Sequence, residues 1–211
     1  MAMIYLVRHG RTGWNREEIF RGRADISLDE FGRRQAQAVA DSLAGQPITA
    51  IFTSPLSRAR ETAAAVAARA GLDYRVEEGL TDIDYGAWQG LPDRDVASRY
   101  PELYRLWHRR PQEVRFPEGE SLEAVAGRAW PVLQRVATDA RGATVVVVAH
   151  RVVNKVLLCR VLGLGLEAFW RIRQDTACVN LVEHADKGWI VHRLNDTCHL
   201  TVLGAAERVD F

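Results

Sequence analysis

Apolar positions along this chain occur in two patterns, short continuous runs and longer stretches with helical spacing. The continuous runs are rich in β-branched residues, which is typical of strands buried on both faces of a parallel sheet. They lie at residues 3–7, 50–53 and 144–149. Apolar residues recur at helical spacing at residues 29–43, 55–70, 121–140 and 152–162, which predicts helices there.

The ends of these stretches carry residues that start or stop helices. Gly45 and Gly71 follow two of the predicted helices, and Pro55 opens the second of them. Ser121 is an expected N-cap, whereas Pro131 inside the same stretch predicts a kink or a break. The pattern therefore predicts where the helices end as well as where they lie.

The remaining segments are less regular. Residues 80–100 predict irregular chain with a short helix after Pro92, and a proline-rich stretch follows. Residues 85–120 are therefore expected to be a cap-like insertion over the main body. Two late apolar stretches, residues 177–183 and 189–194, predict strands joined by a tight turn.

Strands that alternate with helices predict an α/β fold, with residues 1–211 as a single domain. We expect a three-layer sandwich with a mainly parallel sheet, one antiparallel strand from the final hairpin, and helices on both faces. The insertion is expected to form a small cap over the edge where the parallel strands have their carboxyl ends. Ligands of open α/β sheets bind at that edge, so the fold prediction also places the site.

Composition excludes several kinds of partner. The 28 basic and 27 acidic residues give a formal net charge of +1, so no overall field favours nucleic acid or an anionic membrane. Apolar residues make up 47% of the chain, yet no apolar run approaches transmembrane length. The three cysteines show no CxxC spacing, and the N-terminus lacks the apolar region of a signal peptide. We therefore expect a cytoplasmic protein with reduced thiols.

Two histidines occupy equivalent places in this pattern. His9 follows the strand at 3–7 and is preceded by Arg8, and His150 follows the strand at 144–149. Because parallel strands end at the same edge of the sheet, both imidazoles are expected there. One histidine after a strand is commonly structural, but two in this arrangement indicate a site.

A third strand contributes a cation to the same edge. The helix that follows residues 50–53 carries Arg58 in its first turn, where a positive charge opposes the helix dipole. An anion bound between them would remove that conflict, whereas Arg60 is expected on a solvated face. Arginines around an imidazole nucleophile suit phosphoryl transfer, which also needs a carboxylic acid to protonate the leaving oxygen.

Several ordered segments resemble the histidine phosphatase superfamily, the phosphoglycerate-mutase-like enzymes. A single Arg-His-Gly triplet would be a weak signal, but these motifs follow one another from residue 4 to about residue 200. The matching segments are Arg8-His9-Gly10 within 6–15, Ser54-Pro55-Leu56-Ser57-Arg58-Ala59, residues 80–90, Gly119-Glu120-Ser121 and residues 146–150.

The resemblance implies a role for each matching residue. His9 would be the phosphohistidine nucleophile, and Asp82 would stand at the general-acid position. Arg8, Arg58 and His150 would hold the phosphoryl group. Asn15 would lie near the substrate. The family uses no metal, and no cofactor is expected.

Departures from the family pattern bear on the substrate. The family usually has glutamate at Arg11 and at Asp82; the shorter side chain makes Asp84 a competitor as the acid, although a structural role suits Asp84 better. Arg21 stands in a segment that departs from the family pattern and is a candidate substrate contact. Arg151 replaces the usual glycine after the second histidine, and it either binds a carboxylate of the substrate or points away.

Finer resemblance lies with the phosphatase branch. The segments at 111–121 and 194–200 are similar to the metal-independent phosphoserine phosphatases, which makes His199 either a substrate contact or a structural histidine. Tyr85 stands where some of those enzymes have histidine. The expected substrate is a small phosphorylated metabolite such as phosphoserine, and a homodimer is expected.

Other activities remain open on the sequence. The alternatives are a cofactor-dependent phosphoglycerate mutase, a phosphatase of phosphohistidine or phosphotyrosine in proteins, and a non-catalytic binding module. The intact set of Arg8, His9, Arg58 and His150 argues against the last of these.

Overall fold

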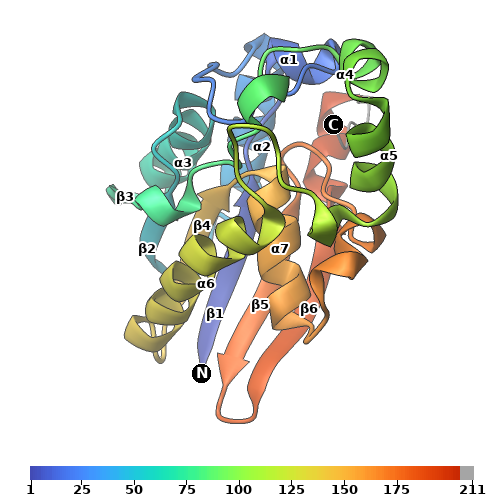
Figure 1. Cartoon of the computed structure of the whole chain (residues 1–211). Coiled ribbons are helices and arrows are strands. Elements are labelled where there is room, and N and C mark those ends of the chain that lie inside the picture. The colour runs from blue at the N-terminus through green and yellow to red at the C-terminus, as the bar shows by residue number, and fades with distance from the viewer. Residues whose placement is uncertain (205–211) are drawn as a thin grey trace.

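A computed structural model describes residues 1–204, and over this range the chain forms a six-stranded sheet in the order β3-β2-β4-β1-β5-β6 (Figure 1). The strands are β1 (Ala2–Arg8), β2 (Ile48–Thr53), β3 (Tyr74–Val76), β4 (Thr144–Ala149), β5 (Val179–Ala185) and β6 (Gly188–Asp196). Among these strands, β5 is antiparallel to both of its neighbours and the other pairings are parallel. The mainly parallel sheet with one antiparallel strand is therefore confirmed.

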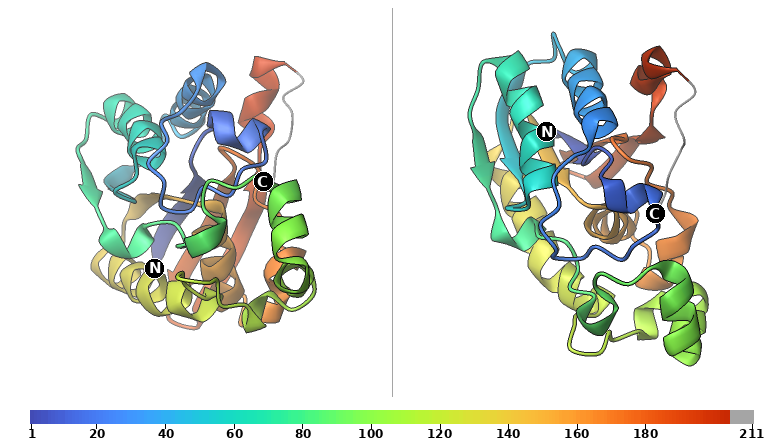
Figure 2. Two further views of the ribbon diagram at one scale, coloured as in Figure 1. Left: turned by 45° about the horizontal axis from the view of Figure 1, so that its top comes forward. Right: turned by 90° about the horizontal axis from the view of Figure 1, so that it is seen from above.

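The two faces of the sheet bury separate apolar cores. On β1, Tyr5 and Val7 belong to one core and Ile4 and Leu6 to the other, because successive side chains of a strand point to opposite faces. Helices cover both faces, which confirms the three-layer sandwich (Figure 2). The first core is covered by α2 (Glu30–Ser42) and α3 (Ser57–Ala70), the second by α6 (Leu122–Asp139) and α7 (Arg151–Val161).

The predicted helix boundaries hold with small changes. Gly71 ends α3 in the left-handed region, at φ 68°, although that helix begins two residues after Pro55. The hydroxyl of Ser121 accepts a hydrogen bond from the backbone of Ala124. The break expected at Pro131 is wrong, because α6 continues through it. The carbonyl four residues earlier belongs to an exposed glycine, so water can replace the missing N–H donor.

Residues 85–120 lie near the carboxyl ends of the parallel strands, on the side of α7 (Figure 1). The segment contains the expected helix after Pro92, α4 (Asp93–Arg99), and a further helix, α5 (Pro101–Arg109), that the proline-rich sequence did not predict. Its aromatic rings pack edge to face and join the core beneath α6 and α7. The segment is thus part of the main core, and its role as a cap stays a prediction. None of the helices within residues 1–204 is long and apolar enough to cross a membrane.

Two glycines let the first turn of α2 lie directly against the loop that follows β1. A Cβ on Gly32 would come within 2.0 Å of the Arg11 carbonyl oxygen, and one on Gly10 would come within 2.5 Å of the Gly32 carbonyl oxygen. Arg11 strengthens the contact, since its Nε donates to the N-cap residue Asp29 at 2.8 Å. The loop after β1, which carries His9, is therefore fixed by backbone contact.

This contact predicts that Gly32→Ala destabilises the protein. Helix propensity alone would favour alanine by about 1 kcal/mol, but the new methyl group would force α2 away from the loop, and overpacking of this kind costs about 1–3 kcal/mol. Since the 2.0 Å approach is to backbone, which cannot move aside as a side chain can, we expect the cost to exceed the gain and the free energy of unfolding in urea to fall by up to about 2 kcal/mol.

Gly127→Ala is the matched control, because Gly127 is an exposed helical glycine on α6 with nothing within 4 Å of its added Cβ. It should gain up to about 1 kcal/mol. If both substitutions moved stability in the same direction, the backbone contact would not be the deciding effect.

Candidate active site

Neighbouring strands deliver the two histidines to one place. His9 follows β1 and His150 follows β4, and these strands pair in parallel from Met3 opposite Thr144 to Arg8 opposite Ala149. The two imidazole centroids lie 5.2 Å apart. The convergence expected from the strand pattern is therefore what the structure has.

His9 is held in a form that can act as a nucleophile. Its Nδ1 lies 2.7 Å from the Gly10 carbonyl oxygen, and since a carbonyl only accepts, Nδ1 carries the proton. That leaves a lone pair on Nε2, which is buried and has no hydrogen-bond partner within residues 1–204. Burial, and then the charge of Arg58, hold the pKa of His9 well below its usual value. The ring is therefore neutral at pH 7.

His150 faces His9 and is oriented by two side chains. Its Nε2 lies 2.7 Å from the Ser54 hydroxyl, at the end of β2, and its Nδ1 lies 3.7 Å from Oδ2 of Asp82. Burial and the positive charge of Arg58 also hold the pKa of His150 well below its ordinary value. The second imidazole is thus neutral as well.

Buried arginines surround the histidines. Arg8, Arg21 and Arg58 are each at most 6% exposed, and their charges all act on His9. Burial lowers the pKa of Arg21 well below the usual arginine value, and the charges of Arg8 and Arg58 lower it further, whereas Asp82 acts in the opposite direction. Clustered, buried cations favour a multiply charged anion such as a phosphoryl group.

Arg58 lies in the first turn of α3, where its positive charge opposes the helix dipole, but its guanidinium is bound by other segments of the chain. Its Nη1 donates to the Ala24 carbonyl at 2.8 Å, and its Nη2 donates to the Gly22 carbonyl at 2.7 Å. The same Nη2 lies 3.1 Å from Oδ2 of Asp82. Acceptors from other segments thus hold the guanidinium within the site.

Of the two candidate acids, Asp82 is the one that reaches the site. It is 4% exposed, and its Oδ1 accepts from the Ile83 backbone at 2.9 Å while its Oδ2 faces Arg58 and His150. Asp84 instead accepts from the Gly86 backbone at 2.9 Å and lies 3.6 Å from Arg23. Its contacts organise the loop, which agrees with the structural role expected for it.

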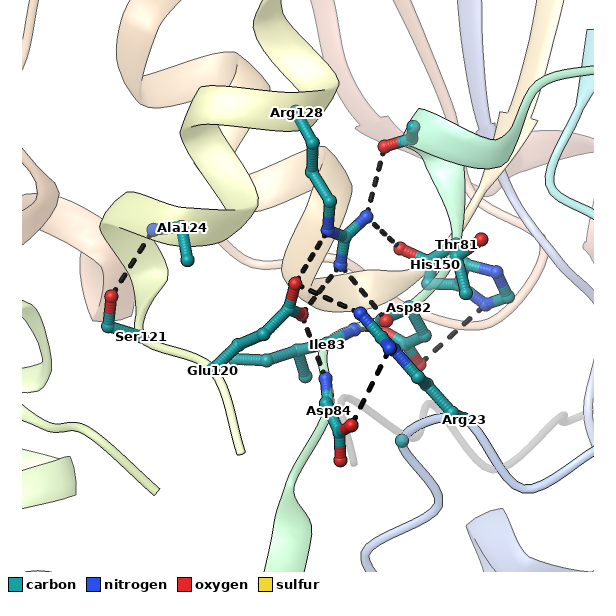
Figure 3. A network of polar contacts seen from close by, with 12 residues as sticks. Arg23, Thr81, Asp82, Ile83, Asp84, Glu120, Ser121, Ala124, Arg128 and His150 are labelled. Atoms are coloured by element: carbon teal, nitrogen blue, oxygen red, sulfur yellow. Dashed lines mark hydrogen bonds and ion pairs between the residues drawn. The ribbon is translucent and has the colours of Figure 1, made fainter. Parts of the chain in front are cut away.

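A network of hydrogen bonds that the sequence did not predict holds the loop of Asp82 (Figure 3). Arg128, on α6, donates to the carbonyls of Gly79, Thr81 and Asp82. Its Nε and Nη2 also form two hydrogen bonds with the carboxylate of Glu120, each at 2.9 Å. That carboxylate in turn accepts from the Asp84 backbone at 3.0 Å. Glu120 stands in one of the motifs quoted above, whereas no motif or spacing in the sequence singled out Arg128.

Asn15 and Arg151, two of the predicted substrate contacts, lie in different surroundings. Asn15 is buried, and its Oδ1 accepts from the backbone and hydroxyl of Thr12 at 2.9 Å each, so it shapes the loop after His9. Arg151 lies beside Tyr85 and 5.8 Å from the ring of Trp170.

His199 contacts the backbone of Ala177, whose N–H donates to the His9 carbonyl at 3.0 Å. Its Nε2 is 3.0 Å from the Ala177 carbonyl oxygen, to which it donates, and the residue lines a groove with side chains of α2. The described contacts of His199 are structural. Within residues 1–204, no three His, Cys, Asp or Glu side chains group as metal ligands would.

Comparison with known proteins covers almost the whole chain. Residues 4–197 match the model of the histidine phosphatase superfamily (branch 1). Phosphoserine phosphatase 1 of Hydrogenobacter thermophilus is 34% identical over 200 residues, 95% of each chain. A probable phosphoglycerate mutase, GpmB of Yersinia pestis, is 32% identical over 209 residues, also 95% of each. The solved structure of Bacillus stearothermophilus YhfR superposes with a TM-score of 0.90 at 28% identity, covering 95% of this chain and 100% of that one.

The lowered pKa of His9 predicts that stability falls as the pH drops below about 6.5. An unfolded chain takes up a proton on this histidine near its ordinary pKa of about 6.5, whereas the buried ring stays neutral to lower pH. The unfolded state then binds more protons than the folded state. The contribution of His9 to the free energy of unfolding is complete above about pH 6.5, and it decreases by up to about 1.4 kcal/mol per pH unit below that pH.

Urea unfolding of the wild type and of His9→Gln, between about pH 5 and pH 7.5, measures this contribution. The pKa of His150 is also lowered, so the variant should keep the part of the pH dependence of stability that comes from His150. It should lose the part that comes from His9. Equal slopes in the two proteins would show that His9 is not the group responsible.

Proposed function

This chain belongs to the histidine phosphatase superfamily and is a phosphomonoester hydrolase, and from this we propose that His9 is its nucleophile and that small phosphorylated metabolites are its substrates. The observation that carries the proposal is the neutral, buried Nε2 of His9, aimed among arginines. Similarity to a phosphoserine phosphatase makes phosphoserine the first substrate to test. A homodimer and a cytoplasmic location stay predictions.

The proposed reaction has two steps. In the first, Nε2 of His9 attacks phosphorus, the bond from phosphorus to the ester oxygen breaks, and that oxygen takes a proton from Asp82. In the second, water attacks the phosphohistidine and gives a proton to the Asp82 carboxylate, so that inorganic phosphate and the neutral histidine are restored.

The cations act on the charge that the phosphoryl group carries. Arg8, Arg21 and Arg58 are already desolvated and held in place, so they stabilise the transferring oxygens without reorganising. Nδ1 of His150 has no hydrogen-bond partner within residues 1–204, and it can donate to a phosphoryl oxygen when the Ser54 hydroxyl donates to Nε2. The pocket is thus complementary to the charge of the transition state.

The acid step depends on where Asp82 is held. Arg128 fixes the backbone on both sides of the aspartate through the Thr81 and Asp82 carbonyls. We assign Arg128 as a positioning residue for the proton donor.

The nucleophile is tested by His9→Gln, which should lower kcat on phosphoserine by at least about 10³-fold. Acid-labile phosphate should accumulate on the wild-type protein after rapid quenching and be absent from the variant. His192→Gln, at an exposed histidine on β6, is the control and should behave as the wild type. Full activity without His9 would refute the mechanism.

The same preparation separates hydrolysis from a mutase reaction. With 3-phosphoglycerate and a 2,3-bisphosphoglycerate primer, a hydrolase releases inorganic phosphate. Accumulation of 2-phosphoglycerate without phosphate release would assign the chain to the mutase activity suggested by its similarity to GpmB.

The acid is tested through the leaving group. Asp82→Asn should lower kcat on phosphoserine by about 10²–10³-fold, but it should change the rate on p-nitrophenyl phosphate less than about tenfold, because that leaving group departs without a proton. Arg128→Met should also lower the rate on phosphoserine more than the rate on p-nitrophenyl phosphate, but by a smaller factor than Asp82→Asn. A merely structural role for Arg128 would lower both rates equally.

Arg135→Met is the matched control for Arg128. Arg135 lies on the same helix, and its Nη2 is 2.7 Å from Glu77 at the surface. It should leave the ratio of the two rates unchanged. A ratio unaffected by Asp82→Asn would show that another group donates the proton.

A further inference from the structure

A cavity of about 250 Å³ lies beside the phosphoryl pocket. Phe20, Trp107 and Trp170 form its apolar walls. Three charged residues also line it: Arg151 is buried, Asp93 is half-buried and Glu18 is exposed. The cavity therefore combines an apolar body with charges of both signs.

Two lining residues of the cavity are sequence neighbours of residues in the site around His9. Phe20 lines the cavity and the next residue, Arg21, belongs to the arginine cluster. Arg151 lines the cavity and the preceding residue, His150, faces His9. An ester group attached to a phosphoryl group at His9 thus has this cavity next to it.

Arg151 is fixed on the inner side of the cavity. It is 6% exposed, forms a side-chain hydrogen bond with Tyr85, and lies 5.8 Å from the Trp170 ring. A guanidinium held in this way binds carboxylates well, since its donors match the two carboxylate oxygens.

The two acidic residues of the lining come from segments that pair through the backbone. The backbone N–H of Asp93 donates to the Glu18 carbonyl at 2.9 Å, which brings the segments together. Asp93 accepts from the Tyr104 hydroxyl at 2.6 Å and so keeps its carboxylate at the cavity. Two carboxylates together attract an ammonium group.

We propose that this cavity is the leaving-group subsite and that it recognises phosphorylated α-amino acids, with Arg151 binding the carboxylate and the Glu18–Asp93 pair attracting the ammonium. The proposal rests on the proposed function, and it adds which charges of the substrate are recognised and by which residues. It also gives a role to the arginine that replaces the usual glycine of the family.

Matched substrates separate the two contacts. Phosphoserine carries both charged groups, 3-phosphoglycerate has a hydroxyl in place of the ammonium, and phosphoethanolamine lacks the carboxylate. Arg151→Met should lower kcat/KM at least about tenfold on phosphoserine and on 3-phosphoglycerate, and should leave phosphoethanolamine within about threefold. Glu18→Gln should lower it about three- to tenfold on phosphoserine and phosphoethanolamine, with 3-phosphoglycerate unchanged.

Controls distinguish failure of this proposal from failure of the proposed function. Activity on p-nitrophenyl phosphate shows that each variant is folded and that the chemistry at His9 is intact; its absence from the wild type would refute the function instead. Glu17→Gln, at the neighbouring exposed glutamate that does not line the cavity, should change none of the three rates.

Two results would overturn the subsite. Equal losses on all three substrates with Arg151→Met would mean that Arg151 acts on the phosphoryl group, not on a carboxylate. Equal behaviour of Glu18→Gln and the wild type on every substrate would remove the ammonium contact and with it the preference for amino acids.

Discussion

Burial of several guanidinium groups around one carboxylate is the constraint on which this structure depends. A charge moved out of water loses hydration that must be replaced by fixed dipoles or opposite charge. Arg58 receives two backbone carbonyls and Asp82, and Arg8 donates to the carbonyl of Gln174. These acceptors come from loops, so the loops are held by the same contacts that hold the cations. In the proposed function, a phosphoryl group adds negative charge among these cations.

Whether a feature of the fold or the site could be predicted from the sequence depends on how far apart in the chain its interacting residues are. The strand at 144–149 was predicted to the residue because its β-branched run has no competing interpretation. The meeting of His9 and His150 followed from the geometry of parallel strands. Asp82 required the family resemblance, since nothing in its local pattern distinguishes it from Asp84. Each of these inferences used local pattern or general topology.

The features that escaped prediction depend on contacts between distant segments. Arg128 serves loop carbonyls 46 to 49 residues away in sequence, which no local periodicity reveals. The helix α5 contains a proline at its first position and packs through Trp107, so its apolar face becomes evident only with its partners in place. Arg11 departs from the family pattern, and its ion pair with Asp29 shows that it supports α2. The strand β3 is too short to give a pattern.

The pairing of β1 with β4 has a consequence for inhibitor design. Because both histidines follow strands joined by a continuous hydrogen-bonded ladder, the spacing of the imidazoles is set by the sheet. A compound that imitates only the phosphoryl group therefore addresses only the rigid part of the proposed site, next to the two histidines. Selectivity for this protein has to come from the part of a compound that reaches Arg151, which stands where the family pattern has glycine.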